Sequence, residues 1–159
     1  MNLSLALRVI LFTLVAPFVV SIVVPGILLD GARPVAAQGL VVSVVGAAIY
    51  AWTAWNFAQT GRGTPAPLDP PKTVVAVGLY RWVRNPMYIG VLLIILGQAI
   101  AYGSLTLVVY AVVMWLVVHA FVVLYEEPDL LRRFGDPYES YRRAVPRWIP
   151  RPPRSAELG

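Results

Sequence analysis

Long uncharged stretches alternate with short charged ones along this chain. Residues 9–29, 34–61 and 85–125 contain no Asp, Glu, Lys or Arg. A helix that spans a membrane needs about 20 apolar residues, so the first two stretches each predict one span. The third would form a helix of roughly 60 Å, about twice the thickness of the hydrocarbon layer of a bilayer. We therefore expect the third stretch to fold back on itself.

The break in the third stretch is expected at Tyr102-Gly103-Ser104. Glycine permits a tight turn there, and two polar side chains suit the membrane interface. The pattern then predicts four spans, at about residues 7–29, 36–58, 86–102 and 104–125.

The expected fold is an all-α membrane protein with four transmembrane helices, of which the last two form a tight hairpin. A cytoplasmic helical segment, 126–150, follows the last span. In this interpretation residues 1–150 form a single domain, and the tail 151–159 is disordered, as chain termini often are.

Two of the predicted spans carry residues that indicate how they bend or pack. Pro17 and Pro25 predict a kink in the first span. In the second span small residues recur every four positions, which favours close packing against another helix of the same chain. These residues are Gly39, Ser43, Ala47 and Ala51.

The composition also indicates a membrane protein. Hydrophobic residues make up 58% of the chain and charged residues 13%, with a mean hydropathy of +0.71. Soluble domains carry about 25% charged residues, so a soluble enzyme is excluded. The chain has no cysteine and a single histidine, His119. This excludes disulfides and thiol nucleophiles, and it argues against a metal site or a Ser-His-Asp triad.

Basic residues predict the orientation. Of the 13 Lys and Arg residues, all except Arg33 lie before the first span, between the second and third spans, or after the last. The positive-inside rule places that side in the cytoplasm, together with both termini. We therefore expect an integral, multi-pass protein of the cell inner membrane. Because topology accounts for the net charge of +5, no nucleic-acid partner is expected.

Two charged motifs at the cytoplasmic side are candidates for a binding site. Glu126 and Glu127 follow the last span, where the helix dipole disfavours carboxylates. They call for cationic partners, either Arg132 and Arg133 or a positively charged ligand. The alternative is two glutamates that are simply solvated at the membrane boundary.

The second motif is Arg84-Asn85-Pro86, at the start of the third span. Asn85 is a good N-cap residue and Pro86 suits the first helical position. Free N–H groups of a first helical turn, with an arginine beside them, suit an anionic group. The alternative is a helix cap next to an interfacial arginine. Together, the acidic and the basic motif would suit a zwitterionic ligand.

These residues carry a family resemblance. The first motif is Gly78-x-Tyr80-x-x-x-Arg84-Asn85-Pro86-x-Tyr88-x-Gly90. The second is Glu126-Glu127-x-x-Leu130-x-x-x-Phe134-Gly135-x-x-Tyr138-x-x-Tyr141. The match closes with Val145-Pro146-Arg147-x-Ile149-Pro150. In order and spacing these motifs resemble the isoprenylcysteine carboxyl methyltransferase family, which includes phospholipid methyltransferase relatives. The resemblance covers roughly residues 62–150, and the chain is similar to the shorter bacterial members.

The resemblance implies an integral-membrane methyltransferase that uses S-adenosylmethionine, without a Rossmann domain, in a pocket at the cytoplasmic face. It places ten residues at cofactor contacts: Lys72, Thr73, Val74, Val75, Tyr80, Asn85, Pro86, Met87, Tyr88 and Glu126. From its charge we add Arg84, which could face the cofactor carboxylate. Val122 stands where eukaryotic members have a substrate-binding arginine, which argues against a prenylcysteine carboxylate as the acceptor.

Methyl transfer from a sulfonium needs orientation more than acid–base chemistry. We place Glu127 with Arg132 or Arg133 around the reacting atoms, with Glu127 accepting the proton of an amine acceptor. For a carboxylate or thiolate acceptor, one of the nearby arginines, Arg132, Arg133 or Arg142, would position it. Tyr138 is placed with Arg142 on the acceptor side.

His119 is a further candidate for acceptor binding. It precedes Glu126 by seven residues, so both would point the same way on a helix. An ionisable side chain within a span is a functional candidate, although a lone neutral histidine also bonds to a neighbouring helix without any such role.

The expected partners are the lipid bilayer and a small or lipid-like methyl acceptor, with no obligate protein partner indicated. Two other function classes stay open: a sterol- or steroid-type reductase that binds NADPH, and a non-enzymatic lipid-binding or adaptor protein.

Overall fold

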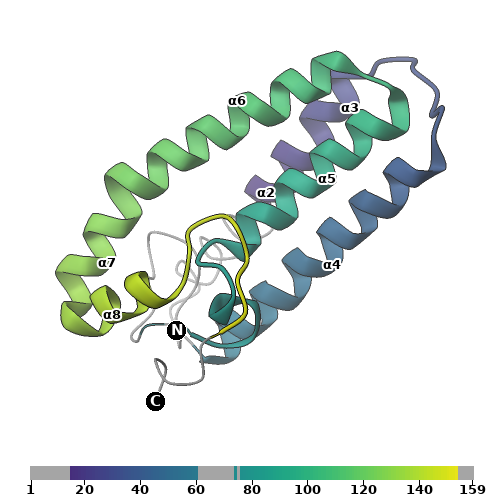
Figure 1. The fold of residues 1–159 in the computed structure, drawn as a ribbon. Helices are drawn as coiled ribbons and strands as arrows, with labels where there is room; N and C mark the ends of the chain where they lie inside the picture. The colour runs from purple at the N-terminus through teal and green to yellow at the C-terminus, as the bar shows by residue number, and fades with distance from the viewer. Residues whose placement is uncertain (1–14, 61–73, 75, 154–159) are drawn as a thin grey trace, which may run out of the picture.

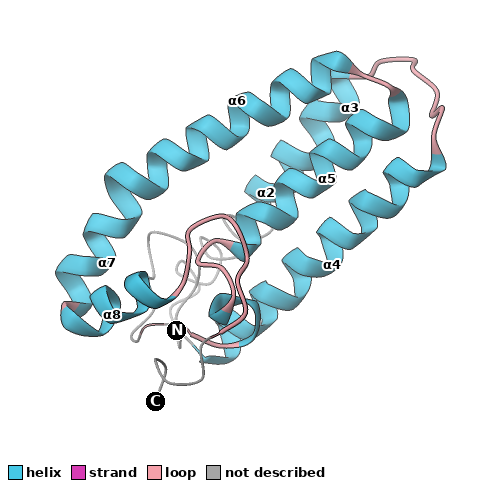
Figure 2. Ribbon diagram, in the orientation of Figure 1, coloured by secondary structure: helices cyan, strands magenta, loops and turns pink. Residues whose placement is uncertain are grey.

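The computed structural model describes residues 15–60, 74 and 76–153. Within these ranges the chain is helical and has no strand (Figure 2). In chain order the elements are α2 (Ala16–Phe18), η2 (Val19–Val23), α3 (Val24–Leu28), α4 (Ala37–Thr60), η3 (Gly78–Arg81), α5 (Pro86–Tyr102), α6 (Leu105–Phe121), η4 (Val122–Glu126), α7 (Glu127–Phe134) and α8 (Asp136–Ala144). Several predictions fall outside the described residues, namely the start of the first span, Lys72, Thr73, Val75 and the tail from residue 154.

Two helical stretches are long and apolar enough to cross a membrane. They are Ala37–Asn56 and Leu105–Phe134, and most of their surface is not covered by the protein itself. The stretches Ala16–Leu28 and Pro86–Tyr102 are apolar as well, but shorter. The second long stretch continues nine residues past Tyr125, where the last span was expected to end. Glu126 and Glu127 therefore lie within a continuous helical segment, and the argument that they stand at its C-terminal end is wrong.

The tightest helix contact joins α4 and α5, which run side by side (Figure 1). A Cβ atom added to Gly46 would lie 2.7 Å from the carbonyl oxygen of Gly90, and one added to Gly90 would lie 2.8 Å from that of Gly46. Gly39 and Gly97 are in equally close contact. Such backbone approach is possible only where side chains are small.

The predicted stripe of small residues is right for Gly39 and Ser43, since Ser43 donates a hydrogen bond to the carbonyl oxygen of Ile94 at 3.1 Å. It is wrong for Ala47 and Ala51, which are exposed. A helix turns every 3.6 residues, so a contact face alternates steps of three and four. A strict step of four drifts off that face.

The chain turns between α5 and α6 at the predicted place. Gly103 adopts a φ of 58°, which favours glycine, and the Ser104 hydroxyl accepts a hydrogen bond from the Leu107 N–H at 3.3 Å as the cap of α6. At the same end of α5, the N–H groups of Val35 and Ala36 donate to the Ala101 carbonyl oxygen, which ties down the start of α4.

Both π-helical turns, η2 and η4, end two residues before a proline. The first ends at Val23 before Pro25, and the second at Glu126 before Pro128. A proline inside a helix lacks its N–H and its ring collides with the carbonyl group four residues earlier. Widening the preceding turn relieves this collision. In both places the helix adapts to the proline in this way and continues.

The residues after α8 cross the end of the bundle. Residues 145–151, which we call the strap, lie beside the start of α5 (Figure 1). The Arg84 N–H donates to the Pro146 carbonyl oxygen at 2.9 Å, and the Arg151 N–H donates to that of Trp82 at 3.0 Å. Val145, the first residue of the strap, is buried together with Tyr138 and Tyr141 of α8.

Candidate functional site

Glu126 lies at the end of the bundle opposite the α5–α6 turn. It is the last residue of η4, and its Oε2 accepts a hydrogen bond from the Tyr88 hydroxyl at 3.1 Å. Tyr88 belongs to the first turn of α5, two residues after Pro86. The predicted first and second motifs therefore meet at these two side chains.

Tyrosines from several elements surround this carboxylate. Tyr80 in η3 is buried and interacts electrostatically with Glu126 and with Tyr141, Tyr88 and Tyr50. Burial, reinforced by these neighbours, raises the pKa of Tyr80 well above its ordinary value. The hydroxyl of Tyr141 donates to the Tyr80 carbonyl oxygen at 2.8 Å and thereby ties α8 to η3. A carboxylate among aromatic rings is an environment that suits a cation.

Glu127 has a different environment from its neighbour. Its side chain is 8% exposed and binds two arginines. Arg84 donates from Nη1 to Oε1 at 2.8 Å, while Arg147 donates from Nε to Oε1 at 2.7 Å and from Nη2 to Oε2 at 2.8 Å. The hydrogen bond to Glu127 raises the pKa of Arg147. Three charge-assisted hydrogen bonds thus hold this carboxylate.

Arg132 and Arg133 were expected beside the glutamates, and the structure places them elsewhere. Both pair with Asp129, and the Arg132 side chain is 77% exposed. They follow Asp129 by three and four residues on α7, which is the spacing of neighbours on a helix surface. Arg142 likewise pairs with Glu139 on α8, at 2.7 Å.

Asn85 occupies the N-cap position of α5, but its side chain does not cap the helix. It is buried and donates from Nδ2 to the Arg147 carbonyl oxygen at 3.1 Å. Arg84 binds Glu127 with its side chain and the strap with its N–H group, and Asn85 binds the strap. Both residues of the basic motif therefore form hydrogen bonds within the protein.

His119 lies away from Glu126. Its Nδ1 accepts a hydrogen bond from Trp148 Nε1 in the strap at 2.9 Å, and its ring stacks on Trp115 with centroids 5.4 Å apart. The π-helical turn between His119 and Glu126 inserts about one extra residue, which rotates Glu126 by about 100° relative to a regular helix. His119 and Glu127 both contact the strap, through Trp148 and Arg147, whereas Glu126 contacts Tyr88.

The structure brings together most of the predicted site residues that it describes. At the strap end of the bundle lie Val74, Tyr80, Arg84, Asn85, Pro86, Met87, Tyr88, Glu126, Glu127 and Tyr138. Tyr138 is buried beside Glu127 and Arg84, and burial raises the pKa of its hydroxyl. Arg147 was not assigned a role. Its signal was the closing Val145–Pro150 motif, whose arginine can pair with a buried glutamate.

Two buried donors near this site have no partner among the described residues. The first is Nε of Arg84, and the second is the Nδ2 atom of Asn56, near the end of α4. A Cβ atom added to Gly78 would lie 2.9 Å from it, so this amide borders η3. A buried donor without a partner is unfavourable by about 1–3 kcal/mol, which a ligand acceptor would offset. An acidic group and a free amide donor at one end of the bundle suit a zwitterionic ligand.

Comparison with known proteins identifies the family. The phospholipid methyltransferase family matches residues 35–137. The chain belongs to this family. Over 78 residues it is 35% identical to the protein-S-isoprenylcysteine O-methyltransferase of Schizosaccharomyces pombe, a match that covers 48% of this chain and 33% of that protein. The chain thus spans about a third of the length of this relative. No solved structure matches it.

The resemblance expected from the motifs is thereby confirmed. The matched range of this phospholipid methyltransferase family member includes η3, the start of α5 and both glutamates, and it ends before Arg147.

Proposed function

We propose that this member of the phospholipid methyltransferase family is a membrane enzyme that transfers a methyl group from S-adenosylmethionine to an amphipathic or lipid-like acceptor. The observation that carries this proposal is the Glu126 carboxylate, held by Tyr88 among buried tyrosines. S-adenosylmethionine carries two positive charges, a sulfonium and an ammonium. A carboxylate and aromatic faces are the groups that bind such charges.

The described residues fit this cofactor. Glu126 would accept hydrogen bonds from its ammonium group, and the rings of Tyr80 and Tyr88 would lie near its cationic part. The Nδ2 atom of Asn56, which has no partner within the described part of the chain, would donate to its carboxylate or to a ring nitrogen. Met87, buried against Tyr80, would line an apolar side. Lys72, Thr73 and Val75 are proposed cofactor contacts from the motif alone.

When bound, the cofactor supplies an activated methyl group. The residues of the chain then have to bind and orient it and keep water away, effects that together are worth roughly 7–11 kcal/mol in favourable cases. The acceptor would offer a carboxylate, a thiol or an amine. Arg132, Arg133 and Arg142 are proposed to position it, which requires that they exchange Asp129 or Glu139 for the acceptor. His119 and Tyr138 are proposed on the acceptor side as well.

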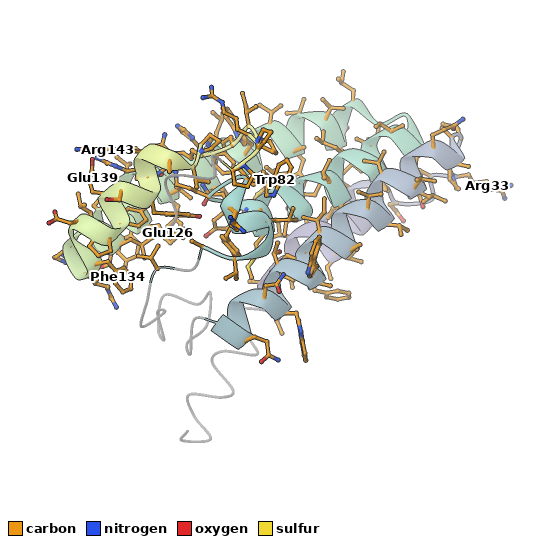
Figure 3. All side chains as sticks on the ribbon, turned by 60° about the horizontal axis from the view of Figure 1, so that its bottom comes forward. Arg33, Trp82, Glu126, Phe134, Glu139 and Arg143 are labelled. Carbon is orange, nitrogen blue, oxygen red and sulfur yellow. The ribbon has the colours of Figure 1, made fainter. Side chains whose placement is uncertain are left out.

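We also propose a topology with four spans, in the cell inner membrane, with both termini and the site in the cytoplasm. Four apolar helical stretches support it, two of which are long enough by themselves. Figure 3 shows Arg33 at one end of the bundle, while Glu126, Glu139 and Arg143 lie at the other. A basic excess at the strap end agrees with the positive-inside rule.

The decisive test is calorimetric titration of the full chain in detergent with S-adenosylhomocysteine, with NADPH as a parallel ligand. We expect micromolar affinity for the first and no binding of the second, followed by a screen of lipid extracts for a methyl acceptor. Binding of NADPH alone would indicate a reductase. Binding of neither by folded protein would contradict the proposal and leave the family fold without this activity.

A further inference from the structure

The strap is bound to the rest of the protein by contacts along most of its length. Its backbone joins the residues before α5 through Pro146, Arg147 and Arg151. Its side chains reach α6 and α7, since Trp148 donates to His119 and Arg147 binds Glu127. The strap therefore connects the residues before α5 with the helical stretch Leu105–Phe134, which are far apart in the sequence.

The pair of Arg147 and Glu127 is the charged part of this attachment. It is bidentate, and the side chains of Glu127 and Arg147 are 8% and 31% exposed. Removing Arg147 would leave the buried Glu127 carboxylate with fewer compensating charges and hydrogen bonds, which is unfavourable. Arg84 alone would offer Glu127 one hydrogen bond where Arg147 offers two.

The position of Glu127 is coupled to the orientation of the Glu126 side chain. The two residues are neighbours at the junction of η4 and α7, and each is bound by a residue near the start of α5. Arg84 donates to Glu127 at 2.8 Å, and Tyr88 donates to Glu126 at 3.1 Å. These contacts set the rotation of the π-helical turn against α5. If Glu127 loses its place, this turn is free to rotate and Glu126 leaves the tyrosines.

We propose that Arg147 is a positioning residue of the methyl-donor site. By binding Glu127 it holds the strap across the bundle end and keeps Glu126 facing the cofactor. This inference rests on the proposed function. It gives Glu127 a positioning role in place of proton transfer, because both of its carboxylate oxygens already accept hydrogen bonds from arginines.

The test uses the full chain in detergent and the variants Arg147→Gln and Arg147→Lys. Two measurements are made on each: hydrogen exchange of the Arg84 and Arg151 amides without ligand, and the Kd of S-adenosylhomocysteine. Both amides donate to hydrogen bonds that exist only while the strap is docked. The matched control is Arg143→Gln, which removes an arginine whose side chain is 79% exposed and paired with Glu139.

For Arg147→Gln we expect exchange of both amides to accelerate at least about tenfold, with α4 and α5 unchanged, and the Kd to rise at least about tenfold. Arg147→Lys keeps the charge but not the bidentate geometry, so it should restore both quantities in part. If Arg147→Gln does not fold, the same two measurements on Arg147→Lys still test the inference. The control should match the wild type.

Unchanged amide exchange in Arg147→Gln overturns the inference, whether or not the wild type binds the ligand. Faster exchange with an unchanged Kd overturns the positioning role and leaves a structural strap. A wild type that does not bind S-adenosylhomocysteine overturns the proposed function, and with it the role at a methyl-donor site, whereas the exchange data still report on the attachment of the strap.

Discussion

The hydroxyl group of Tyr88 donates a hydrogen bond to Oε2 of Glu126 across 3.1 Å, and so connects the first turn of α5 with the end of a π-helical turn 38 residues later. This contact joins the two sequence motifs of the family. The two adjacent glutamates have different partners: Glu126 interacts with tyrosines, while Glu127 is bound by two arginines.

Replacing Glu126 by glutamine tests the charge. We expect Glu126→Gln to weaken binding of S-adenosylhomocysteine by about 1.5–3 kcal/mol, the value of a hydrogen bond to a charged group. Tyr88→Phe keeps the charge but removes the hydrogen bond that orients it, and should cost about 0.5–1.5 kcal/mol. Calorimetric titration measures both. Glu139→Gln, at a partly exposed carboxylate on α8 that pairs with Arg142 and Arg143, is the control. An unchanged affinity in folded Glu126→Gln would remove this residue from the site.

Asn85 offers a test of the contact between the strap and α5. Asn85→His should keep affinity for S-adenosylhomocysteine within about tenfold, because an imidazole N–H can replace the amide that donates to the Arg147 carbonyl oxygen. Asn85→Leu removes the donor and leaves that carbonyl without its partner, at a cost of about 1–3 kcal/mol in the free energy of unfolding. Denaturant unfolding in detergent and the same titration distinguish the two variants. Equal behaviour of both would show that this hydrogen bond contributes nothing.

The sequence predicted the helical character, the turn at Gly103 and the residues that gather at the strap end. These follow from local patterns: charge-free stretches, a glycine between polar residues, and motifs of fixed spacing. The partners of Glu127 did not follow from any local pattern. Arg84 lies 43 residues before it and Arg147 lies 20 after it, whereas the nearer Arg132 and Arg133 had Asp129 within one helical turn.

The two π-helical turns were also beyond the sequence analysis. Pro25 was expected to kink its helix, and Pro128 was not considered at all, because the last span was expected to end before it. The extra residue of η4 shifts the phase of every later position, so that Glu126 no longer shares a direction with His119. Periodicity arguments assume a regular helix and fail across such a turn.

The glycine contact between α4 and α5 is expected to tolerate no side chain. Gly97→Ala places a Cβ atom against the Ser43 backbone and hydroxyl, and should lower the free energy of unfolding by about 1–3 kcal/mol or more through overpacking. Gly26→Ala in α3 is the matched control, because nothing lies within 4 Å of the added atom. That variant should be neutral or more stable by up to about 1 kcal/mol, the helix propensity of alanine over glycine. Thermal unfolding in detergent measures both, and similar stabilities would contradict the close packing.

The last prediction concerns Pro25 and the π-helical turn before it. Proline has no N–H, so carbonyl groups four and five residues before it lack a helical donor. In the structure the Ser21 carbonyl oxygen accepts from Gln98 Nε2 at 2.6 Å, and the Val20 carbonyl oxygen accepts from the Tyr110 hydroxyl at 2.9 Å. Side chains of α5 and α6 thus satisfy the carbonyls that the proline leaves free, as an apolar surrounding requires.

Tyr110→Phe should therefore cost about 0.6–1.7 kcal/mol of unfolding free energy in the wild type. In a Pro25→Ala background the new N–H can take over, and the same substitution should cost less than half as much. A double-mutant cycle by unfolding in detergent measures this coupling. Tyr102→Phe is the control, since no hydrogen bond of the Tyr102 hydroxyl is found within the described part of the chain. Equal costs in both backgrounds would show that Tyr110 does not compensate for the proline.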